Sequence, residues 1–327
     1  STSRRVSHVI DYVGVLVLTV SASALILFTS LGGTSFAWLS WQSGLLAIGG
    51  VVLAAWFVRI ERRAAEPVLP MPLFSNRVFR SASAIGFVVG FAMFGAMTFL
   101  PLYFQEVRGA SPTNSGLRLL PMMVGLFGAS IVVGQLVAKG RKYRPFPIAG
   151  TAVMTLGLGL LATLGVTTSS WLTAFYMFVL GTGIGLVMQI LITAVQNAVR
   201  PEDIGSATAG ANFFRSIGGS FGTAVFGALY VNELPHQMAK GLGAIHYHGP
   251  SIAVSHLTPQ TLHTLPLAVI GVIVHSISAS VARIYVWAVP VGLVALLLSF
   301  TLPEIALRSS HHPVADEIPL SNADPVT

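Results

Sequence analysis

Long uncharged stretches constrain this chain more than any other feature of its sequence. No Asp, Glu, Lys or Arg occurs within residues 12–58 or within residues 145–199. Cationic clusters at 59–63 and 139–144 fall outside these stretches. Because a charged side chain is costly at the centre of a bilayer, this spacing is typical of a chain that crosses a membrane several times.

The overall composition excludes an ordinary soluble domain. Charged residues make up 9% of the 327 residues and hydrophobic residues 54%, whereas about 25% charged residues are usual for soluble proteins. The formal net charge of +7 is explained by cations in short loops between spans, which argues against nucleic-acid binding. Cysteine is absent, which excludes disulfides and thiolate metal sites.

The hydrophobic pattern predicts an all-α, polytopic membrane protein with about eight transmembrane helices. A helix needs about 20 apolar residues to cross the hydrocarbon core. The segments of suitable length and polarity are 12–31, 43–60, 82–104, 117–138, 146–167, 172–197, 208–231 and 283–302.

The distribution of cations predicts the orientation of these spans. With a cytoplasmic amino terminus, fourteen Lys and Arg residues lie on the cytoplasmic side and four (Arg108, Arg118, Lys240 and Arg283) on the other. This bias follows the positive-inside rule and places both termini in the cytoplasm. We expect 265–282 to be an interfacial or packed extracellular helix rather than a ninth span, and the tail 305–327 to be disordered.

Signatures of enzymes are missing from the sequence. It contains no HExxH or Walker A motif, so we expect neither an enzyme nor a bound cofactor. His246 and His248 could ligate a metal, but no nearby carboxylate completes a familiar site, and we assign no metal. A solvated extracellular loop at 233–279 explains the histidines there, and a proton-sensitive loop is the alternative.

Aromatic, sulfur-containing and amide side chains inside the predicted spans are candidates for binding an apolar ligand. Flexible thioethers and rings form adaptable apolar surfaces, although packing against lipid explains them equally well. Gln189 lies well inside its span, where an amide must find a partner or face an aqueous cavity. The candidate substrate-binding residues are Phe91, Phe94, Met97, Tyr103 and Gln189.

Glycines and one arginine form a second candidate group. Gly218 and Gly219 permit close helix approach or bending, with packing alone as the plainer interpretation. Arg215 lies near the cytoplasmic start of the span 208–231, where it could extend to the interface. Gly181, Gly183 and Gly185 lie in a hydrophobic span without strand–helix context, so a nucleotide loop is excluded.

Several motifs in a fixed order carry a family resemblance. They are Asp11-Tyr-Val-Gly14, the connector RIERRAAEPVLPMPLF (59–74), LPLYFQEVRGASPTNSGLRLLP (100–121), Gly181-x-Gly183-x-Gly185 and Arg215-Ser-Ile-Gly218-Gly219-Ser-Phe-Gly222. Together they resemble the major facilitator superfamily, specifically its 14-span drug:proton antiporters of the EmrB/QacA type. One departure is Ala138-Lys139-Gly140, which stands where that family usually has an Asp after Gly134-Gln-Leu.

The resemblance implies a carboxyl-terminal portion of such a carrier. Residues 1–80 would hold two central helices and a cytoplasmic connector, 81–304 the carboxyl-terminal six-helix bundle with the loop 233–279, and 305–327 the cytoplasmic tail. The missing amino-terminal half would carry the proton-linked acidic residue. The bundle would line a midplane cavity, and Arg215, Gly218 and Gly219 would shape a cytoplasmic gate.

The implied function is proton-coupled efflux of lipophilic, often cationic, compounds across the cell inner membrane. The proton gradient would supply the energy, and the partners would be the lipid bilayer, the substrate and the amino-terminal half. An exporter of a metabolite, lipid or siderophore is one alternative, and a central charged residue would favour a charged metabolite. A truncated, non-transporting membrane fragment is the other alternative.

Overall fold

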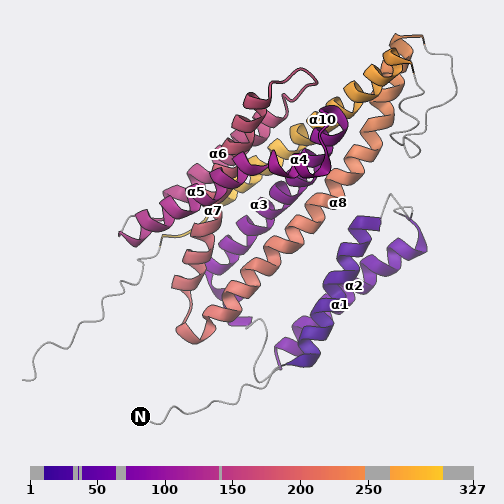
Figure 1. The fold of residues 1–327 in the computed structure, drawn as a ribbon. Coiled ribbons are helices and arrows are strands. Elements are labelled where there is room, and N and C mark those ends of the chain that lie inside the picture. Colours follow the sequence, from indigo (N-terminus) through magenta and orange to yellow (C-terminus); the bar gives the residue numbers. More distant parts are fainter. Residues whose placement is uncertain are drawn as a thin grey trace, which may run out of the picture.

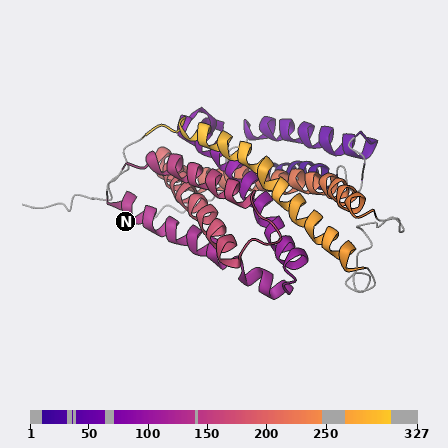
Figure 2. The ribbon, with the colours of Figure 1, turned by 90° about the horizontal axis from the view of Figure 1, so that it is seen from above.

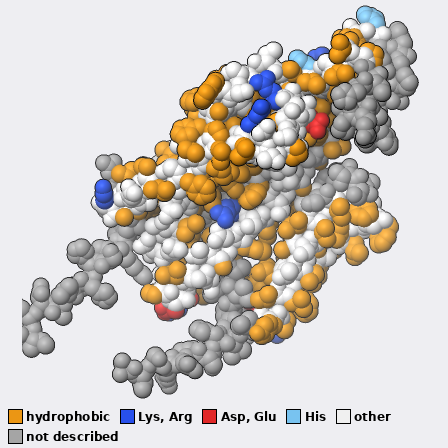
Figure 3. Space-filling view, viewed as in Figure 1, with side chains coloured by type: hydrophobic (Ala, Val, Ile, Leu, Met, Phe, Trp, Pro, Cys, Tyr) orange, Lys and Arg blue, Asp and Glu red, His pale blue; other side chains and the backbone are white. Residues whose placement is uncertain are grey.

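The fold is helical throughout its long elements, as the sequence predicts. A computed structural model describes residues 11–31, 36, 39–63, 71–139, 142–246 and 266–304. Eight long helices occur in these residues (Figure 1). Six segments are long and apolar enough to cross a membrane, while α6 is apolar but shorter, and α8 is long but less apolar. Hydrophobic side chains cover much of the visible helix surface (Figure 3), which suits contact with lipid.

Six helices form a two-layered bundle. In the first layer α5, α7, α3 and α8 lie side by side in that order, and α6 and α10 cover one side of it, with α6 packed on α7 and α10 packed on α6, α3 and α8. The bounds are α3 Arg77–Leu102, α5 Leu120–Ala138, α6 Pro145–Leu161, α7 Ser170–Ala198, α8 Ile204–Ala244 and α10 Leu267–Ser299. Shorter elements are η1 Met71–Ser75, η2 Tyr103–Val107, α4 Pro112–Leu117 and η3 Pro201–Asp203.

The first two helices form a separate hairpin. Helices α1 (Tyr12–Leu31) and α2 (Trp41–Glu61) pack on each other, and the Ser21 hydroxyl donates to the Gly50 carbonyl at 2.8 Å. Asp11 caps α1 by accepting a hydrogen bond from the Gly14 amide at 2.8 Å. The hairpin contacts the bundle through α1 and α8, and Figures 1 and 2 both show it beside α8.

Polar residues begin the bundle helices and tie their ends together. The Asn76 side chain accepts from the Val78 amide at 2.9 Å, which caps α3. Its amide group donates to the Ala198 carbonyl at 2.7 Å, at the end of α7. Because α3 and α7 run in opposite directions, this bond fixes the relative height of the two central helices.

Glycines bring the helices of the bundle close together. A Cβ atom at Gly181 would collide with the Met122 carbonyl of α5, and one at Gly183 would collide with the Met154 backbone of α6. The alternating glycines of α7 therefore serve two different interfaces, as small residues do in membrane bundles. Packing is the structural role of this motif.

The connection after α6 is longer than the sequence predicts. Helix α6 ends at Leu161, so the last residues of the predicted span 146–167 belong to a turn. The buried Tyr103 hydroxyl donates to the Gly165 carbonyl at 2.8 Å, and Arg108 donates to the Val166 carbonyl at 2.8 Å. These bonds attach the turn to η2, which a reading of hydropathy alone does not reveal.

The prediction for 233–279 is wrong at both ends. Helix α8 continues to Ala244, and α10 begins at Leu267 and runs without interruption to Ser299. The separate helix expected at 265–282 is therefore the first half of α10. At about 1.5 Å per residue, the 41 residues of α8 extend roughly 60 Å, twice the hydrocarbon thickness of about 30 Å.

The two helix ends pack on each other beyond the bundle. Leu234 and Met238 of α8 and Val269 and Ile273 of α10 are buried. An ideal Cβ at Gly241 would lie 3.6 Å from the Val272 Cβ. The predicted loop 233–279 is therefore shorter, since both of its ends belong to helices. The connection between these helices, residues 247–265 with His248, lies outside the described residues. The amino terminus and the tail 305–327 lie outside them as well.

Candidate substrate and gating site

The candidate site lies on the side of α3 and α7 that α6 and α10 leave uncovered. Helices α3 and α7 occupy the middle of the first layer, with α8 and α5 on either side. On α3, Gly90, Phe94 and Met97 follow one helical stripe at intervals of four and three residues. This stripe meets α8 where Arg215 and Gly219 lie.

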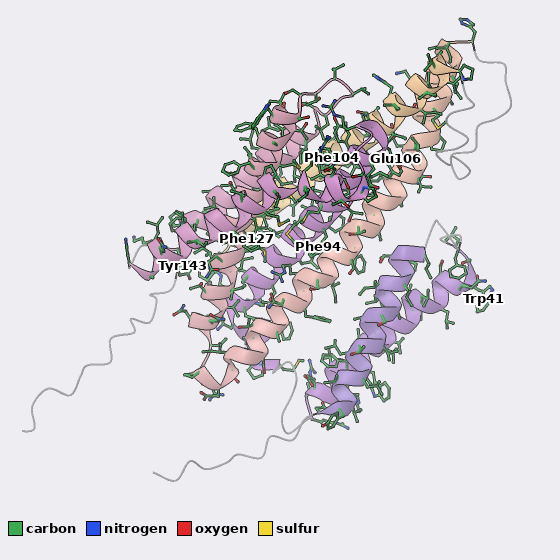
Figure 4. All side chains as sticks on the ribbon, in the orientation of Figure 1. Trp41, Phe94, Phe104, Glu106, Phe127 and Tyr143 are labelled. Atoms are coloured by element: carbon green, nitrogen blue, oxygen red, sulfur yellow. The ribbon has the colours of Figure 1, made fainter. Side chains whose placement is uncertain are left out.

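Phe94 presents an aromatic ring on this surface. Its side chain is 42% exposed, and its ring lies over Gly219, where an added Cβ would collide with it. Figure 4 shows Phe94 in the middle of the bundle, between Tyr143 at one end and Phe104 and Glu106 at the other. Phe94 is therefore accessible near the middle of the bundle, and its role in binding stays a prediction.

Arg215 lies deeper than the sequence analysis expects. It is eleven residues past Ile204, the start of α8, which is about 16 Å along the helix at 1.5 Å per residue. Its backbone and Cγ pack against Gly90, the fourteenth of the 26 residues of α3. Arg215 therefore lies near the middle of the packed α3–α8 pair rather than at the start of α8, and its place on the cytoplasmic side stays a prediction.

The Arg215 side chain reaches from α8 towards α7. Its Nη1 lies 3.9 Å from the Met188 sulfur, and its buried Nε has no hydrogen-bond partner. No carboxylate of a described residue lies within ion-pair distance of it. The side chain as a whole is half-buried, so this cation is accessible from the uncovered side of the bundle.

A polar stripe on α8 leads to Arg215. Thr208, Asn212 and Arg215 are spaced by four and three residues, which places them on one helix face. Thr208 accepts a hydrogen bond of 3.3 Å from the Gln196 side chain of α7. Gln196 thus finds the partner that an amide inside a span requires, although hydropathy does not single out Thr208.

Gln189 lies on the opposite flank of α7, towards α5. An ideal Cβ at Gly134 would lie 3.8 Å from the Gln189 Cγ. The side chain is half-buried, and its backbone carbonyl accepts from the Thr193 hydroxyl at 2.9 Å. Gln189 and Arg215 therefore lie on the α5 and α8 sides of α7, and Arg215 contacts Met188, the residue just before Gln189.

Three other predicted residues are more deeply packed than Phe94. The Phe91 ring meets the Phe226 ring edge-on at 5.4 Å, and Met97 packs against the core. Tyr103 is fully buried, and its hydroxyl donates a hydrogen bond to the Gly165 carbonyl. The structure therefore groups Phe94 with Arg215 and Gly219 but does not bring Tyr103 to them.

Gly218 and Gly219 form the contact between α8 and α3. A Cβ at Gly218 would collide with the Phe87 carbonyl. Both glycines lie in the packed part of α8, well past its first residue, Ile204. Their packing role is clear from the geometry, and their role in a gate stays a prediction.

Two pockets formed by described residues do not include the predicted substrate-binding residues. One of about 350 Å³ includes Phe74, Phe87 and Phe214, and one of about 390 Å³ includes Phe104 and Trp171. Neither includes Phe94, Met97 or Gln189. No cluster of three or more His, Asp or Glu suited to a metal occurs among the described residues.

The comparison with known families identifies the family of this chain. Residues 5–223 match the model of the Major Facilitator Superfamily. The chain belongs to this superfamily. Its apolar helices are those of a multi-pass membrane protein, and the relatives it matches are transporters.

The chain spans about half the length of the curated relatives it matches. It is 44% identical over 310 residues to an uncharacterised MFS-type transporter of Mycobacterium tuberculosis, a match that covers 94% of this chain and 44% of the relative. It is 37% identical to the multidrug transporter MdtP of Bacillus subtilis, covering 79% and 51% respectively. It is also 36% identical to a tetracycline resistance determinant of Streptomyces rimosus, covering 55% and 52%.

Two solved transporter structures share the arrangement of helices. An inward-facing bacterial homologue of the human lysosomal transporter Spinster matches with a TM-score of 0.57 at 17% identity, covering 88% of this chain and 64% of that one. The Escherichia coli fucose:proton symporter matches with a TM-score of 0.52 at 21% identity, covering 72% and 52%. At these identities the likeness shows the fold alone.

Proposed function

We propose that this chain is the carboxyl-terminal portion of a 14-span, proton-coupled multidrug exporter in the cell inner membrane, with both termini in the cytoplasm. The accessible aromatic ring of Phe94 at mid-depth is the observation that carries the proposal. Relatives named for multidrug transport and tetracycline resistance support it. A match that covers nearly all of this chain but under half of a relative supports the assignment to one portion.

The proposed mechanism is alternating access between two six-helix bundles. The uncovered side of α3, α7 and α8 would form one wall of a cavity, and an amino-terminal bundle would form the other. Phe94 would provide apolar contact to the substrate, and Gln189 would provide a hydrogen bond. The close contact of Gly218 and Gly219 with α3 would let this wall move as one body, with the gate at its cytoplasmic end.

Efflux from cells tests the function directly. The full-length protein is expressed in a bacterium that lacks its own drug pumps, and the export of a lipophilic fluorescent dye is followed with and without a protonophore. We expect export that stops when the protonophore collapses the gradient. Export that continues without a gradient would exclude proton antiport, and the absence of export for a broad panel of lipophilic dyes would exclude the multidrug assignment.

Gln189 offers a sharper test of the wall itself. Gln189→Ala removes an amide from the proposed cavity and should slow dye export about two- to tenfold, the range expected for losing one hydrogen bond. Gln135→Ala is the matched control, because Gln135 is exposed on α5 and should leave export unchanged. Unchanged export in Gln189→Ala would remove this residue from the cavity.

A further inference from the structure

The mid-depth position of Arg215 bears on the class of compound that the transporter accepts. A guanidinium remains charged under nearly all conditions, and a charge near the bilayer centre is costly unless it is paired or faces water. Charged residues in such positions mark substrate or ion pathways. The position of Arg215 beside Gly90, at the middle of α3, therefore needs a physical explanation.

The described residues do not neutralise this charge. Nη1 meets the weakly accepting Met188 sulfur at 3.9 Å, and Nε is buried without a partner. The ion pairs described for the neighbouring segment join Arg200 to Glu202 and Asp203. These residues precede α8, whereas Arg215 lies eleven residues past its start. The guanidinium thus retains unused donors in a place where an unsatisfied donor is expensive.

The neighbours of Arg215 suit a small lipophilic molecule. Gly219 follows one helical turn later and lies under the exposed Phe94 ring, so cation and ring share the uncovered side of the bundle. An apolar surface with one well-placed charged group is the usual composition of a small-molecule site. The guanidinium fork is suited to bind a carboxylate or similar oxygen anion through two hydrogen bonds.

We propose that Arg215 binds an anionic oxygen group of the exported compound, while Phe94 contacts its apolar body. This inference rests on the proposed export function and names its substrate class: lipophilic acids and zwitterions rather than simple cations. The other source of a carboxylate is an acidic residue of the amino-terminal half, which would pair with Arg215 whatever the charge of the substrate.

The test compares two dyes that share a xanthene ring system but differ in charge. Export of anionic fluorescein and of cationic rhodamine 123 is measured for the full-length transporter and for Arg215→Met, Arg215→Lys and Arg283→Met. Arg283→Met is the matched control, because Arg283 is exposed on α10. Membrane content and thermal stability of each variant are measured alongside.

We expect Arg215→Met to slow fluorescein export by about tenfold or more, as for the loss of a charged hydrogen bond, and to leave rhodamine export within about twofold. Arg215→Lys should retain part of the fluorescein export, and Arg283→Met should behave as the wild type. Equal loss of both dyes would overturn the proposal and assign Arg215 to a pair within the protein. Unchanged fluorescein export would overturn it as well.

A binding measurement separates this inference from the export function. If the wild type exported neither dye, the proposed function would fail, and equilibrium binding of fluorescein to the purified full-length protein would then decide the inference. Binding that is present in the wild type and lost in Arg215→Met would support an anion site. Binding that is absent, or equal in both proteins, would contradict it.

Discussion

At the residue scale, neighbouring glycines of α8 differ in what surrounds them. Gly218 and Gly222 face the α3 backbone, where a methyl group would collide with the carbonyls of Phe87 and Phe91. Gly227, on the same helix, has open space where its Cβ would lie. The Gly-Gly-x-x-Gly motif therefore brings two backbones into contact, while Gly227 is free of that constraint.

The pair Gly218→Ala and Gly227→Ala tests this difference. Gly218→Ala should destabilise the α3–α8 contact by about 1–3 kcal/mol, because the added methyl forces the helices apart. Gly227→Ala should be neutral or slightly stabilising, because alanine favours the helix. Thermal unfolding of the purified protein measures both, and equal midpoints for the two variants would show that the helices do not approach this closely at Gly218.

At the element scale, α8 and α10 show why hydropathy misplaced the loop 233–279. Residues 233–244 are polar enough to resemble a loop, yet Leu234 and Met238 bury an apolar stripe against α10. That stripe depends on residues more than thirty positions away, so only the folded pair reveals it. In the same way, the turn after α6 depends on Tyr103 and Arg108, whose partners the sequence does not indicate.

The absence of cysteine allows a direct test of the α8–α10 pair. In a protein with Gly241→Cys and Val272→Cys, the two Cβ atoms would lie about 3.6 Å apart, within the range of a disulfide. We expect a cross-link under mild oxidation, detected after proteolysis within 247–265. Gly243→Cys with Val272→Cys is the control, because nothing lies within 4 Å of the Gly243 Cβ position; equal cross-linking of both pairs, or of neither, would contradict the observed packing.

At the scale of the whole molecule, the long uncharged stretches indicate a multi-pass membrane protein. The arrangement of the candidate site depends on tertiary packing. The long apolar stretches suffice to predict eight helices. Phe94 and Gln189 are proposed from polarity and aromatic content, and their role in binding stays a prediction. Tyr103 is also an aromatic residue, but it is buried and its hydroxyl donates to the Gly165 carbonyl in the turn after α6. Hydropathy does not predict where that turn lies. The depth of Arg215 likewise depends on which α3 residue faces it, and that is Gly90 at the middle of the helix.

The central claim concerns the complete transporter, in which this bundle would form one wall of a cavity and exchange protons for drug. Its most direct test uses purified full-length protein in sealed vesicles, with an imposed pH gradient and a lipophilic dye inside or outside. The account predicts dye movement against its concentration only in the presence of the gradient, with protons moving in the opposite direction. Dye movement that is equal with and without the gradient, or without any counterflow of protons, would contradict it.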